Sequence, residues 1–556
     1  MSRAGALRRG RTTGPGTATG PVPRTLPSPE QTRRALAGRV RAVGAVLLDE
    51  PPPAGDDPET DAAAVLSALA EHLAAHPTND RVWLVLAGLA AAFPTRDEVD
   101  RTRRRIELAD PEQAAIVLLE DGMAAVGAAG TPLAQVTVEV GRVLVDVDFT
   151  ARHDLHTGIQ RVVRQTVPLW HTDHDIVPVA WTHARGAMRP LDEVESARIF
   201  RWAADRSTHG GEDDPHRVAD TDDRVVIPWR SVVVLPEVPQ PDVTPRIAAI
   251  GACSNNRVVL VGHDAIPLLS AETLELAEPE KFMAFLSAVK FADRIAGVSR
   301  SSAAEFASFA AMLAAQGLTG PVTVAVPLPV EFAVQDPAGP VPAGPAQATD
   351  PAVPRLATSG TAANAAPEVV VVGSHDPRKN HLAILHAAEV LWQRGRRFRL
   401  SFVGSPGSNE EFLTRVRRLQ HRGRDVHLRT GLSDAQLRGA IATARFTVFP
   451  SLHEGYGLPV AESLALGTPV ITTSYGSTAE IAEGGGAITV DPRDDAALTG
   501  AMERLLTSDV DVDRLRAKIG GRRERSWQDY ADELWGAIVR PVLRDLSGTA
   551  DVEGHP

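Results

Sequence analysis

Acidic side chains and glycines stand together in the most informative stretch of the chain, FTVFPSLHEGYGLPVAESLALGTPVITT at residues 446–473. Its first five residues predict a strand. Pro459 is typical of the first turn of a helix, because its missing N–H group needs no partner there. Gly455 and Gly457 let the backbone between strand and helix come close to a ligand. Since the unpaired N–H groups of a helix start favour an anion, the stretch predicts a phosphate site.

Two glutamates flank this predicted phosphate site. Glu462 is expected in the first turn of the helix, where a carboxylate repels phosphate unless it serves another group. We therefore expect it to accept hydrogen bonds from ribose hydroxyls. Glu454, at the end of the strand, is placed to accept from sugar hydroxyls on the far side of the phosphates. The alternative, two ordinary solvated glutamates, is disfavoured by the stretch as a whole.

Two adjacent cations, Arg378 and Lys379, follow another predicted strand in VVVGSHDPRKNHLAILHA at residues 370–387. Departure of a nucleoside diphosphate builds negative charge on its β-phosphate, and fixed cations there lower the barrier. We therefore expect both side chains to bind a diphosphate. The alternative is a solvated basic turn, and we assign no role to Asp376.

The first half of the chain supplies further candidates. Gly158 follows the first strand of DVDFTARHDLHTGIQRVVRQ at residues 146–165, where a glycine lets backbone amides approach an anion. His263 and Asp264 end another strand, and His263 is expected to face a cleft. The alternative is that this pair only braces its loop. Ser299 is predicted to cap a helix, with donation to a phosphate as the alternative.

Near-continuous apolar runs rich in valine alternate with helical stretches from residue 136 onward. This pattern predicts an α/β fold of two doubly wound, Rossmann-like domains that face a cleft, after an N-terminal helical region. Ligands of such sheets bind at the carboxyl ends of strands and in clefts between domains. The expected strands are VTVEV, RVLVDVDF, DIVPVAW, SVVVLP, RVVLVGH and RIAGVS, then EVVVVGS, FRLSFVG, VHLRTG, FTVFPS, PVITT and AITVDP.

Composition is that of an ordinary globular protein. The chain has 556 residues, of which 43% are hydrophobic and 23% charged, and this length predicts two or three domains. A net charge of −12 argues against nucleic acid as a partner. The single cysteine, Cys253, excludes an internal disulfide and a cysteine-cluster metal site. No apolar run approaches the roughly 20 residues that span a bilayer. We expect a cytoplasmic protein and leave open peripheral contact with the inner face of a membrane.

These motifs resemble glycosyltransferase family 4, also called group 1, over about residues 140–543. The resemblance implies a retaining enzyme of the GT-B type, in which Glu462 binds the nucleotide ribose and Glu454 meets the donor sugar. Asp376 stands where many members have a glutamate. The residues that the resemblance assigns to catalysis are Arg378, Lys379, Glu454 and His263. Those that it assigns to donor binding are Gly158, Gly373, Leu432, Gly455, Tyr456, Gly457, Leu458 and Glu462.

The predicted domain boundaries combine composition with this resemblance. A polar, acidic segment at 205–223 is expected to be a loop insertion, and Thr95 with Glu98 predicts a helix capping box. The predicted parts are a disordered basic tail (1–34), a helical accessory region (35–135), a first Rossmann-like domain on the acceptor side (136–334), a linker (335–366), a second Rossmann-like domain that binds the donor (367–525), a helix crossing back to the first domain (526–545) and a tail (546–556).

We therefore expect transfer of a hexosyl group from a nucleotide-diphosphate sugar to a hydroxyl of a glycan, a lipid-linked glycan or a small molecule. The Pro-Arg-Lys-Asn pattern at residues 377–380 favours GDP-mannose or another GDP- or UDP-hexose. We expect no metal, because no Asp-x-Asp motif lies in the expected cleft strands; Asp146 and Asp148 of DVD lie on a first-domain strand and are not expected to serve. We also expect no cofactor. The alternative is a non-catalytic GT-B scaffold that recruits a protein partner through residues 35–135. Four charged residues kept in one cleft favour the enzyme.

Overall fold

The computed structural model describes most of the chain, and the predicted tails, insertion and linker lie largely outside the described residues. Described are residues 28–53, 57–129, 131–155, 157–202, 219, 221–329, 366–405, 407, 409–522 and 525–550. The predicted boundary at residue 35 is wrong. Helix α1 (Pro29–Leu47) begins inside the predicted basic tail, because Ser28 and Gln31 form a capping box that fixes its start.

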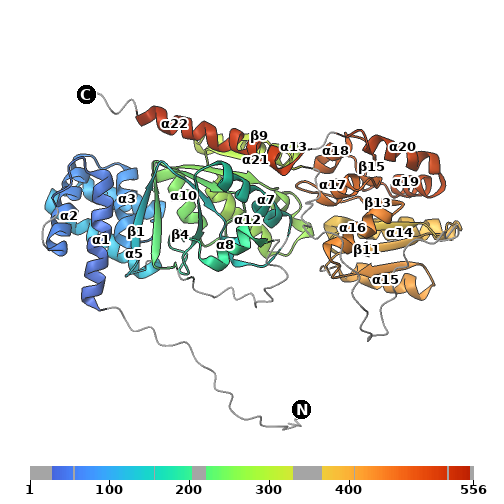
Figure 1. Ribbon diagram of the computed structural model, residues 1–556, viewed down its shortest axis with the longest axis horizontal. Coiled ribbons are helices and arrows are strands. Elements are labelled where there is room, and N and C mark those ends of the chain that lie inside the picture. The colour runs from blue at the N-terminus through green and yellow to red at the C-terminus, as the bar shows by residue number, and fades with distance from the viewer. Residues whose placement is uncertain are drawn as a thin grey trace, which may run out of the picture.

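Five helices form the N-terminal region, which Figure 1 shows in blue beside the first sheet. They are α1, α2 (Pro58–Ala75), α3 (Asn79–Ala90), α4 (Arg96–Glu107) and α5 (Pro111–Ala129). The predicted capping box of Thr95 and Glu98 starts α4 and is confirmed. Trp83 and Phe93 belong to one hydrophobic cluster with Trp181 of the first sheet. The helices thus share a core with the next domain, and their predicted role in binding a partner stays a prediction.

The first sheet has nine strands in the order β1-β5-β4-β3-β2-β6-β7-β8-β9. All its pairings are parallel except those of β4, which is antiparallel to both neighbours. The strands are β1 (Gln135–Val140), β2 (Val143–Asp146), β3 (Ile176–Trp181), β4 (Met188–Pro190), β5 (Arg224–Trp229), β6 (Val232–Leu235), β7 (Arg257–Gly262), β8 (Arg294–Gly297) and β9 (Val322–Ala325). Strands β4, β5 and β9 were not among those expected. The strand expected over 142–149 ends at Asp146, because α6 begins at Asp148.

Helices cover both faces of this sheet, as its strands require. In β2, Val143 and Val145 pack on one face and Leu144 on the other, so the strand is buried on both sides. The helices are α6 (Asp148–Arg152), α7 (Gly158–Asp173), α8 (Glu193–Phe200), α10 (Thr244–Cys253), α11 (Ile266–Leu269), α12 (Ala277–Val289) and α13 (Arg300–Met312), with short 3₁₀ turns at Ala271–Thr273 and Leu313–Gln316.

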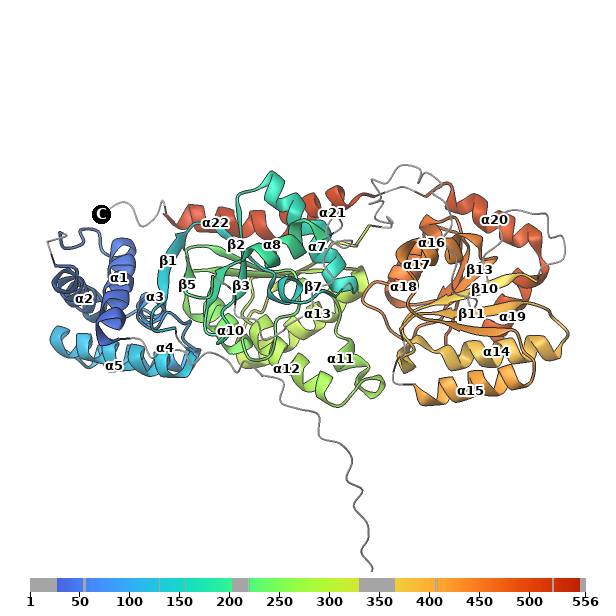
Figure 2. The same cartoon turned by 60° about the horizontal axis from the view of Figure 1, so that its bottom comes forward.

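The second sheet has six strands, all parallel, in the order β12-β11-β10-β13-β14-β15. Figure 2 shows α14 and α15 below this sheet, and α18 beside it on the side of the first domain. The strands are β10 (Glu368–Val372), β11 (Arg399–Val403), β12 (Val426–Arg429), β13 (Phe446–Phe449), β14 (Val470–Thr473) and β15 (Ala487–Val490). The helices are η3 (Pro377–Lys379), α14 (His381–Gln393), α15 (Glu410–His421), α16 (Asp434–Thr443), α17 (Leu458–Ala465), α18 (Gly476–Ala482), α19 (Asp495–Thr507) and α20 (Asp509–Ile519). Two doubly wound Rossmann-like domains are therefore present, as the sequence predicts.

The last helical segment returns to the first domain, as predicted (Figure 1). It consists of α21 (Trp527–Leu534), a π-helical turn (Trp535–Val539) and α22 (Arg540–Ala550). Trp170 donates to the Ala531 carbonyl over 3.0 Å, and the Trp535 ring stacks on His174. The predicted tail boundary at 546 is wrong, because α22 continues to Ala550. Among the helices that the structure describes, none has the length and apolar character needed to cross a membrane.

Candidate active site

Two loops of the second domain meet at the point where the strand order of its sheet reverses. From β10 the chain winds through β11 to β12, whereas β13, β14 and β15 lie on the other side of β10. The loop after β10 carries Arg378 and Lys379, and the loop after β13 carries Glu454. Because ligands of doubly wound sheets bind outside the carboxyl ends of strands at this reversal, the loops occupy the expected place for a ligand site.

Glu454 lies at the centre of a buried charge cluster. Lys379 Nζ lies 2.6 Å and Arg378 Nη1 2.8 Å from its Oε1 atom, and Ser451 Oγ also donates to it over 2.6 Å. The Glu454 side chain is 11% exposed. Burial by itself raises the pKa of Glu454, but the cations of Lys379 and Arg378 outweigh burial and lower this pKa to about 2. Glu454 is therefore ionised throughout the neutral range.

The glycine turn after Glu454 has the local structure that the sequence predicts. Gly457 has a φ of +103°, which few residues other than glycine adopt, and α17 starts directly after it with Leu458 and Pro459. A Cβ atom on Gly455 would lie 2.4 Å from the carbonyl oxygen of His263 in the first domain. The turn thus brings the backbone of the second domain against that of the first.

Glu462 lies one turn deeper in α17 than the sequence predicts. Because α17 begins at Leu458, Glu462 is its fifth residue and lies outside the first turn. Its Oε1 atom accepts a hydrogen bond from Arg161 Nη1 of the first domain over 2.7 Å. Burial raises the pKa of Glu462, and Arg161 partly offsets this effect. The carboxylate therefore faces the other domain across the contact between the two.

His263 and Asp264 follow β7 at the carboxyl edge of the first sheet. The Nε2 atom of His263 lies 2.9 Å from the Pro236 carbonyl oxygen, and burial lowers the pKa of His263 to about 4. The imidazole is therefore neutral near pH 7, so this bond requires a donating Nε2–H group. Burial also raises the pKa of Asp264 to about 6. Asp264 Oδ1 accepts from the Ile266 amide over 3.1 Å, which holds the loop in shape.

One cavity of about 230 Å³ between the domains collects most of the predicted residues. Those that line it are Gly158, His263, Lys379, Glu454, Gly455, Tyr456, Gly457 and Leu458. A second cavity of about 260 Å³ in the second domain holds Gly373 and Leu432. The side chain of Lys379 adjoins both, since it lies 3.6 Å from the place of a Cβ atom on Gly373. Arg378 and Glu462 line neither cavity; Arg378 contacts Glu454, and Glu462 contacts Arg161.

Several side chains that join the two domains escaped the sequence interpretation. His453 Nε2 lies 2.8 Å from Glu305 of α13, and its Nδ1 lies 2.9 Å from Ser270 Oγ. Ser299 and Ser302 both donate to the Gly455 carbonyl, over 2.7 and 2.9 Å. Ser299 also caps α13, as predicted. A contact between residues about 150 positions apart has no signal in local spacing.

Arg161 is the missed residue for which the sequence did hold a signal. It lies three residues after Gly158 on α7, and residues three apart share one face of a helix. Since Gly158 was predicted to approach an anion, a cation three residues later on the same helix face, Arg161, was also a candidate for the site. Its partner on α17 is more than 300 residues away in sequence and follows only from the tertiary structure.

Buried carboxylates also lie at the carboxyl ends of β2 and β6. Glu237 accepts from the Phe149 amide over 2.6 Å, and Asp146 accepts from Trp181 Nε1 over 2.8 Å. Burial raises the pKa of Glu237 to about 8 and that of Asp146 to about 7. The first of these bonds ties α6 to the loop after β6, and the second joins β2 to β3. In the described part of the chain, no group of three or more His, Cys, Asp or Glu side chains is placed to hold a metal ion.

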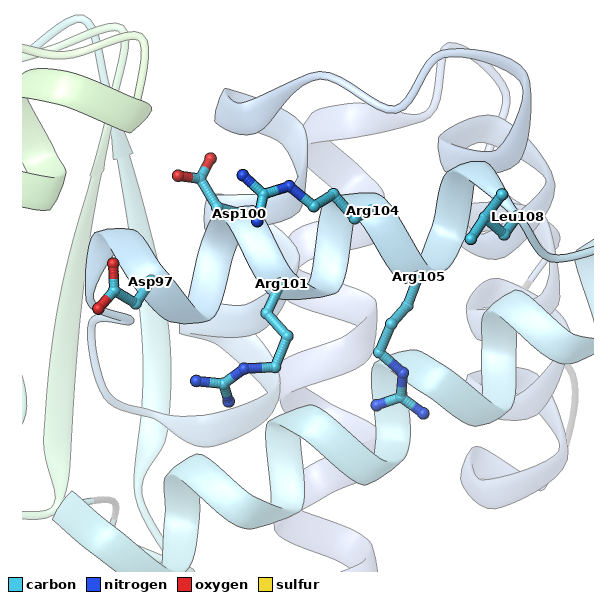
Figure 3. A pocket seen from close by; sticks show the side chains of 6 residues that line it. All are labelled: Asp97, Asp100, Arg101, Arg104, Arg105 and Leu108. Carbon is cyan, nitrogen blue, oxygen red and sulfur yellow. The ribbon is translucent and has the colours of Figure 1, made fainter.

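The outer face of α4 carries a hollow of about 450 Å³, which Figure 3 shows from close by. Its lining is Asp97, Asp100, Arg101, Arg104, Arg105 and Leu108. Arg105 is engaged by Glu120 and Asp121 of α5, and Leu108 is almost fully exposed. This hollow lies on the N-terminal helices and includes none of the residues predicted for the site.

The comparison with protein families decides what the second domain is. A family model described as "Glycosyl transferases group 1" matches residues 366–508, which span β10 to α19 and include both site loops. The second domain is a group 1 glycosyltransferase domain. The predicted resemblance is thereby confirmed, and the paired glutamates, the adjacent cations and the glycine turn all lie within this group 1 domain.

Curated relatives extend the similarity beyond the group 1 domain. The serotype-specific mannosyltransferase WbdA of Escherichia coli is 28% identical over 350 residues, which cover 62% of this chain and 40% of the relative. The MMP alpha-(1->4)-mannosyltransferase of Mycolicibacterium hassiacum is 35% identical over 125 residues, which cover 21% of this chain and 30% of the relative. The chain thus spans less than half the length of these two relatives. A solved structure of an alpha,alpha-trehalose 6-phosphate synthase from Burkholderia multivorans aligns with this chain with a TM-score of 0.41 and 13% sequence identity. The alignment covers 59% of this chain and 72% of the synthase chain.

Proposed function

We propose that the chain is a retaining glycosyltransferase that moves a hexosyl group from a nucleoside-diphosphate sugar to a hydroxyl of a glycan. The observation that carries this proposal is the buried cluster of Glu454 with Lys379 and Arg378 beside a cavity between the domains. A buried ion cluster contributes little to stability, because desolvation offsets its attraction. The cluster lies where the strand order of the sheet reverses, which is where doubly wound sheets bind their ligands. Ligand binding therefore accounts for the burial of these charges.

Each part of the cavity then has a task. The diphosphate lies by Lys379 and the starts of α7 and α17, where cations and free backbone N–H groups favour negative charge. Glu462 accepts from the ribose hydroxyls and Glu454 from those of the hexose. The cavity of Gly373 and Leu432 receives the base, since it adjoins Lys379 on the other side.

The transfer proceeds on one face of the sugar. The bond between the anomeric carbon and the leaving phosphate oxygen breaks, and the acceptor oxygen bonds to that carbon from the same side. The acceptor proton passes to the leaving diphosphate. Lys379 and Arg378 lower the barrier because they stabilise the charge that develops on the β-phosphate. Neutral His263 lines the cavity and supports the sugar without adding charge.

The transferred group is mannosyl, from GDP-mannose. The Pro-Arg-Lys-Asn pattern at residues 377–380 favours a GDP- or UDP-hexose, and both curated relatives described above are named as mannosyltransferases. The acceptor is a glycan hydroxyl, in keeping with the same relatives.

Thermal-shift measurements with GDP, UDP, ADP and their sugar derivatives test donor binding, because a ligand of the native state raises the unfolding temperature. We expect GDP and GDP-mannose to raise it most. Release of mannose from GDP-mannose, followed by NMR, then reports turnover and the anomer formed first. If no nucleotide raises the unfolding temperature, the proposal is wrong. If the β anomer of mannose is released first, the proposed retaining stereochemistry is wrong.

A further inference from the structure

Two carboxylates line the cavity between the domains, and each domain supplies one of them. Glu454 of the second domain pairs with Lys379 and Arg378, so its charge is balanced within the protein. Asp264 of the first domain follows β7 and is only partly buried. Among the residues that the structure describes, none forms an ion pair with Asp264. The cavity therefore contains one carboxylate whose charge the described residues do not balance by direct contact.

The loop that carries Asp264 holds its carboxylate in a defined place. Asp264 Oδ1 accepts from the Ile266 amide over 3.1 Å, and the Ala265 amide donates to Glu305 Oε2 over 2.7 Å. The Oδ2 atom of Asp264 accepts no hydrogen bond from any residue in the described part of the chain. Since the side chain lines the cavity, Oδ2 is the oxygen that remains for a ligand.

Asp264 also lies against the glycine turn of the second domain. Its Oδ2 atom is 2.8 Å from the place of a Cβ atom on Gly455, the residue after Glu454. The two carboxylates thus approach the cavity from opposite domains at the same point. Burial raises the pKa of Asp264 to about 6, so most of its carboxylate is ionised above about pH 7.

The charges of the cavity disfavour a second anionic ligand beside the donor. Of the described residues that line it, Lys379 is the one cation, since His263 is neutral near pH 7. The proposed function places the donor diphosphate at Lys379, which uses this cation and adds further negative charge. An acceptor with a phosphate close to its reacting hydroxyl would then meet like charge on the diphosphate and on Asp264.

The hydroxyls of a neutral sugar suit the same carboxylate. An O–H group donates and a carboxylate oxygen accepts, and a hydrogen bond to an ionised acceptor is stronger than one between neutral groups. Same-face transfer requires the acceptor hydroxyl to lie beside both the leaving diphosphate and the donor hexose. The proposed function gives Glu454 to the donor hexose, so the adjacent carboxylate of the other domain, Asp264, is placed for the acceptor.

We propose, building on the function proposed above, that Asp264 binds the acceptor and selects a neutral sugar over one that carries phosphate. Its Oδ2 atom accepts from a hydroxyl other than the reacting one and thereby orients the acceptor. The proton of the reacting hydroxyl still passes to the leaving diphosphate. The acceptor is then the neutral sugar end of a glycan.

Transfer to a neutral and to an anionic sugar tests this selection. The full chain receives the nucleotide sugar that raises its unfolding temperature most, with methyl α-mannoside, mannose 6-phosphate or water as the acceptor. The quantity compared is kcat/KM for methyl α-mannoside divided by kcat/KM for mannose 6-phosphate. Asp264→Asn removes the charge, and its amide oxygen still accepts from Ile266. The matched control is Glu305→Gln, since Glu305 supports the same loop but lies outside the cavity.

We expect the wild-type chain to prefer methyl α-mannoside. Asp264→Asn should lower this preference about tenfold, mainly through a higher KM for methyl α-mannoside, because a charge-assisted bond becomes a neutral one. Hydrolysis of the donor by water should change by less than about threefold, because the donor keeps its own contacts. Glu305→Gln should leave the preference unchanged. Asp264→Ser serves if the asparagine variant does not fold, since a serine hydroxyl also accepts from a backbone amide two residues on.

The outcomes separate this inference from the proposed function. A wild-type chain that hydrolyses no nucleotide sugar overturns both. A wild-type chain that hydrolyses its donor, yet transfers to neither sugar or prefers mannose 6-phosphate, overturns the role of Asp264 alone. A preference that falls by less than about threefold in Asp264→Asn does the same. A merely structural role lowers hydrolysis and both transfers together, and so also leaves the preference unchanged.

Discussion

Lys379 and Glu454 form a 2.6 Å ion pair between two loops that follow neighbouring strands of the second sheet, and each side chain is 11% exposed. Neither residue could hold its place alone, because a buried charge without a partner costs several kcal/mol. Each loop thus orients the other, and the pair fixes the position at which an incoming diphosphate meets positive charge.

Replacing Lys379 by alanine should abolish most of the transfer activity. The β-phosphate loses a fixed cation, and loss of one such group costs about 100-fold or more in rate. The measurement is the initial rate of sugar transfer or hydrolysis, with circular dichroism to check the fold. Lys281→Ala, which removes an exposed lysine paired with Glu278, is the matched control. A normal rate of transfer by Lys379→Ala would show that Lys379 does not stabilise the leaving β-phosphate.

Glu462→Ala should weaken donor binding by about 10-fold or more, because ribose loses its charged acceptor. Titration with GDP-mannose measures the effect. Glu480→Ala removes a carboxylate that also joins the domains, through the Ser301 amide over 2.6 Å, and lies outside the cavity. If both variants lose the same affinity, the effect of Glu462 comes from loosening the domains rather than from the ribose.

Gly455→Ala should reduce activity strongly while each domain stays folded. The added Cβ atom would lie 2.4 Å from the His263 carbonyl oxygen, so the two domains must move apart at the cavity. Small-angle scattering and activity are the two readouts. Gly439→Ala in α16 meets no atom within 4 Å and should leave activity unchanged while adding about 0.5–1 kcal/mol of stability. An active Gly455→Ala enzyme would mean that this contact is not needed.

The contact of His453 with Glu305 should stabilise the protein more at low pH. Burial lowers the pKa of His453, but the bond and charge of Glu305 and the charge of Asp264 outweigh burial and Arg378, so this pKa is raised above 6.5. A raised histidine pKa adds stability that is fully present below pH 6.5 and is lost as the pH rises through the folded-state value. The unfolding temperature of wild type minus that of His453→Gln should thus be larger at about pH 6 than at about pH 8.5.

The excess of this difference at low pH should shrink in a Glu305→Gln background, because the glutamine removes the main cause that raises the pKa of His453 while burial still lowers it. With Glu305 intact, a difference that instead grows with pH would contradict the assigned direction of the shift.

Activity should survive addition of a chelator. Arg378 and Lys379 supply the positive charge that a divalent ion provides in other transferases, so EDTA should change the rate by less than about twofold. The independence from metals and cofactors stays a prediction until this assay. Loss of activity with EDTA, restored by Mg²⁺ or Mn²⁺, would contradict it.

The strands of the second domain follow closely from the sequence because parallel strands are buried on both faces. EVVVV at β10 and FTVF at β13 are continuous apolar runs, each ending at a turn. The antiparallel strand β4 of the first domain lacks this signal. In β4, Arg189 interrupts the apolar pattern, yet it is buried and paired with Glu195. A buried charge whose partner lies on a following helix is read as a surface residue when only neighbours in sequence are considered.

The N-terminal helices show a similar division. Their apolar spacing and the capping box of Thr95 are local properties, and both are visible in the sequence. Their union with the first sheet is not local: the Phe93 amide donates to the Gly186 carbonyl, and Asn255 donates to Asp80. No pattern within the N-terminal helices or the first sheet indicates that the two pack together. The sequence therefore suggests a separate helical unit, whereas in the structure both share one core.

The sequence by itself determined the chemistry of the second domain: the strand, the glycine turn, the helix start and the charges of Glu454, Arg378 and Lys379, since each depends on residues a few positions apart. Only the tertiary structure decided which groups meet across the two domains. The pairing of Arg161 with Glu462 and the contact of His453 with Glu305 join residues far apart in the chain. Such contacts form because both sheets bring their carboxyl edges together and bury them, and burial is a property of the whole fold.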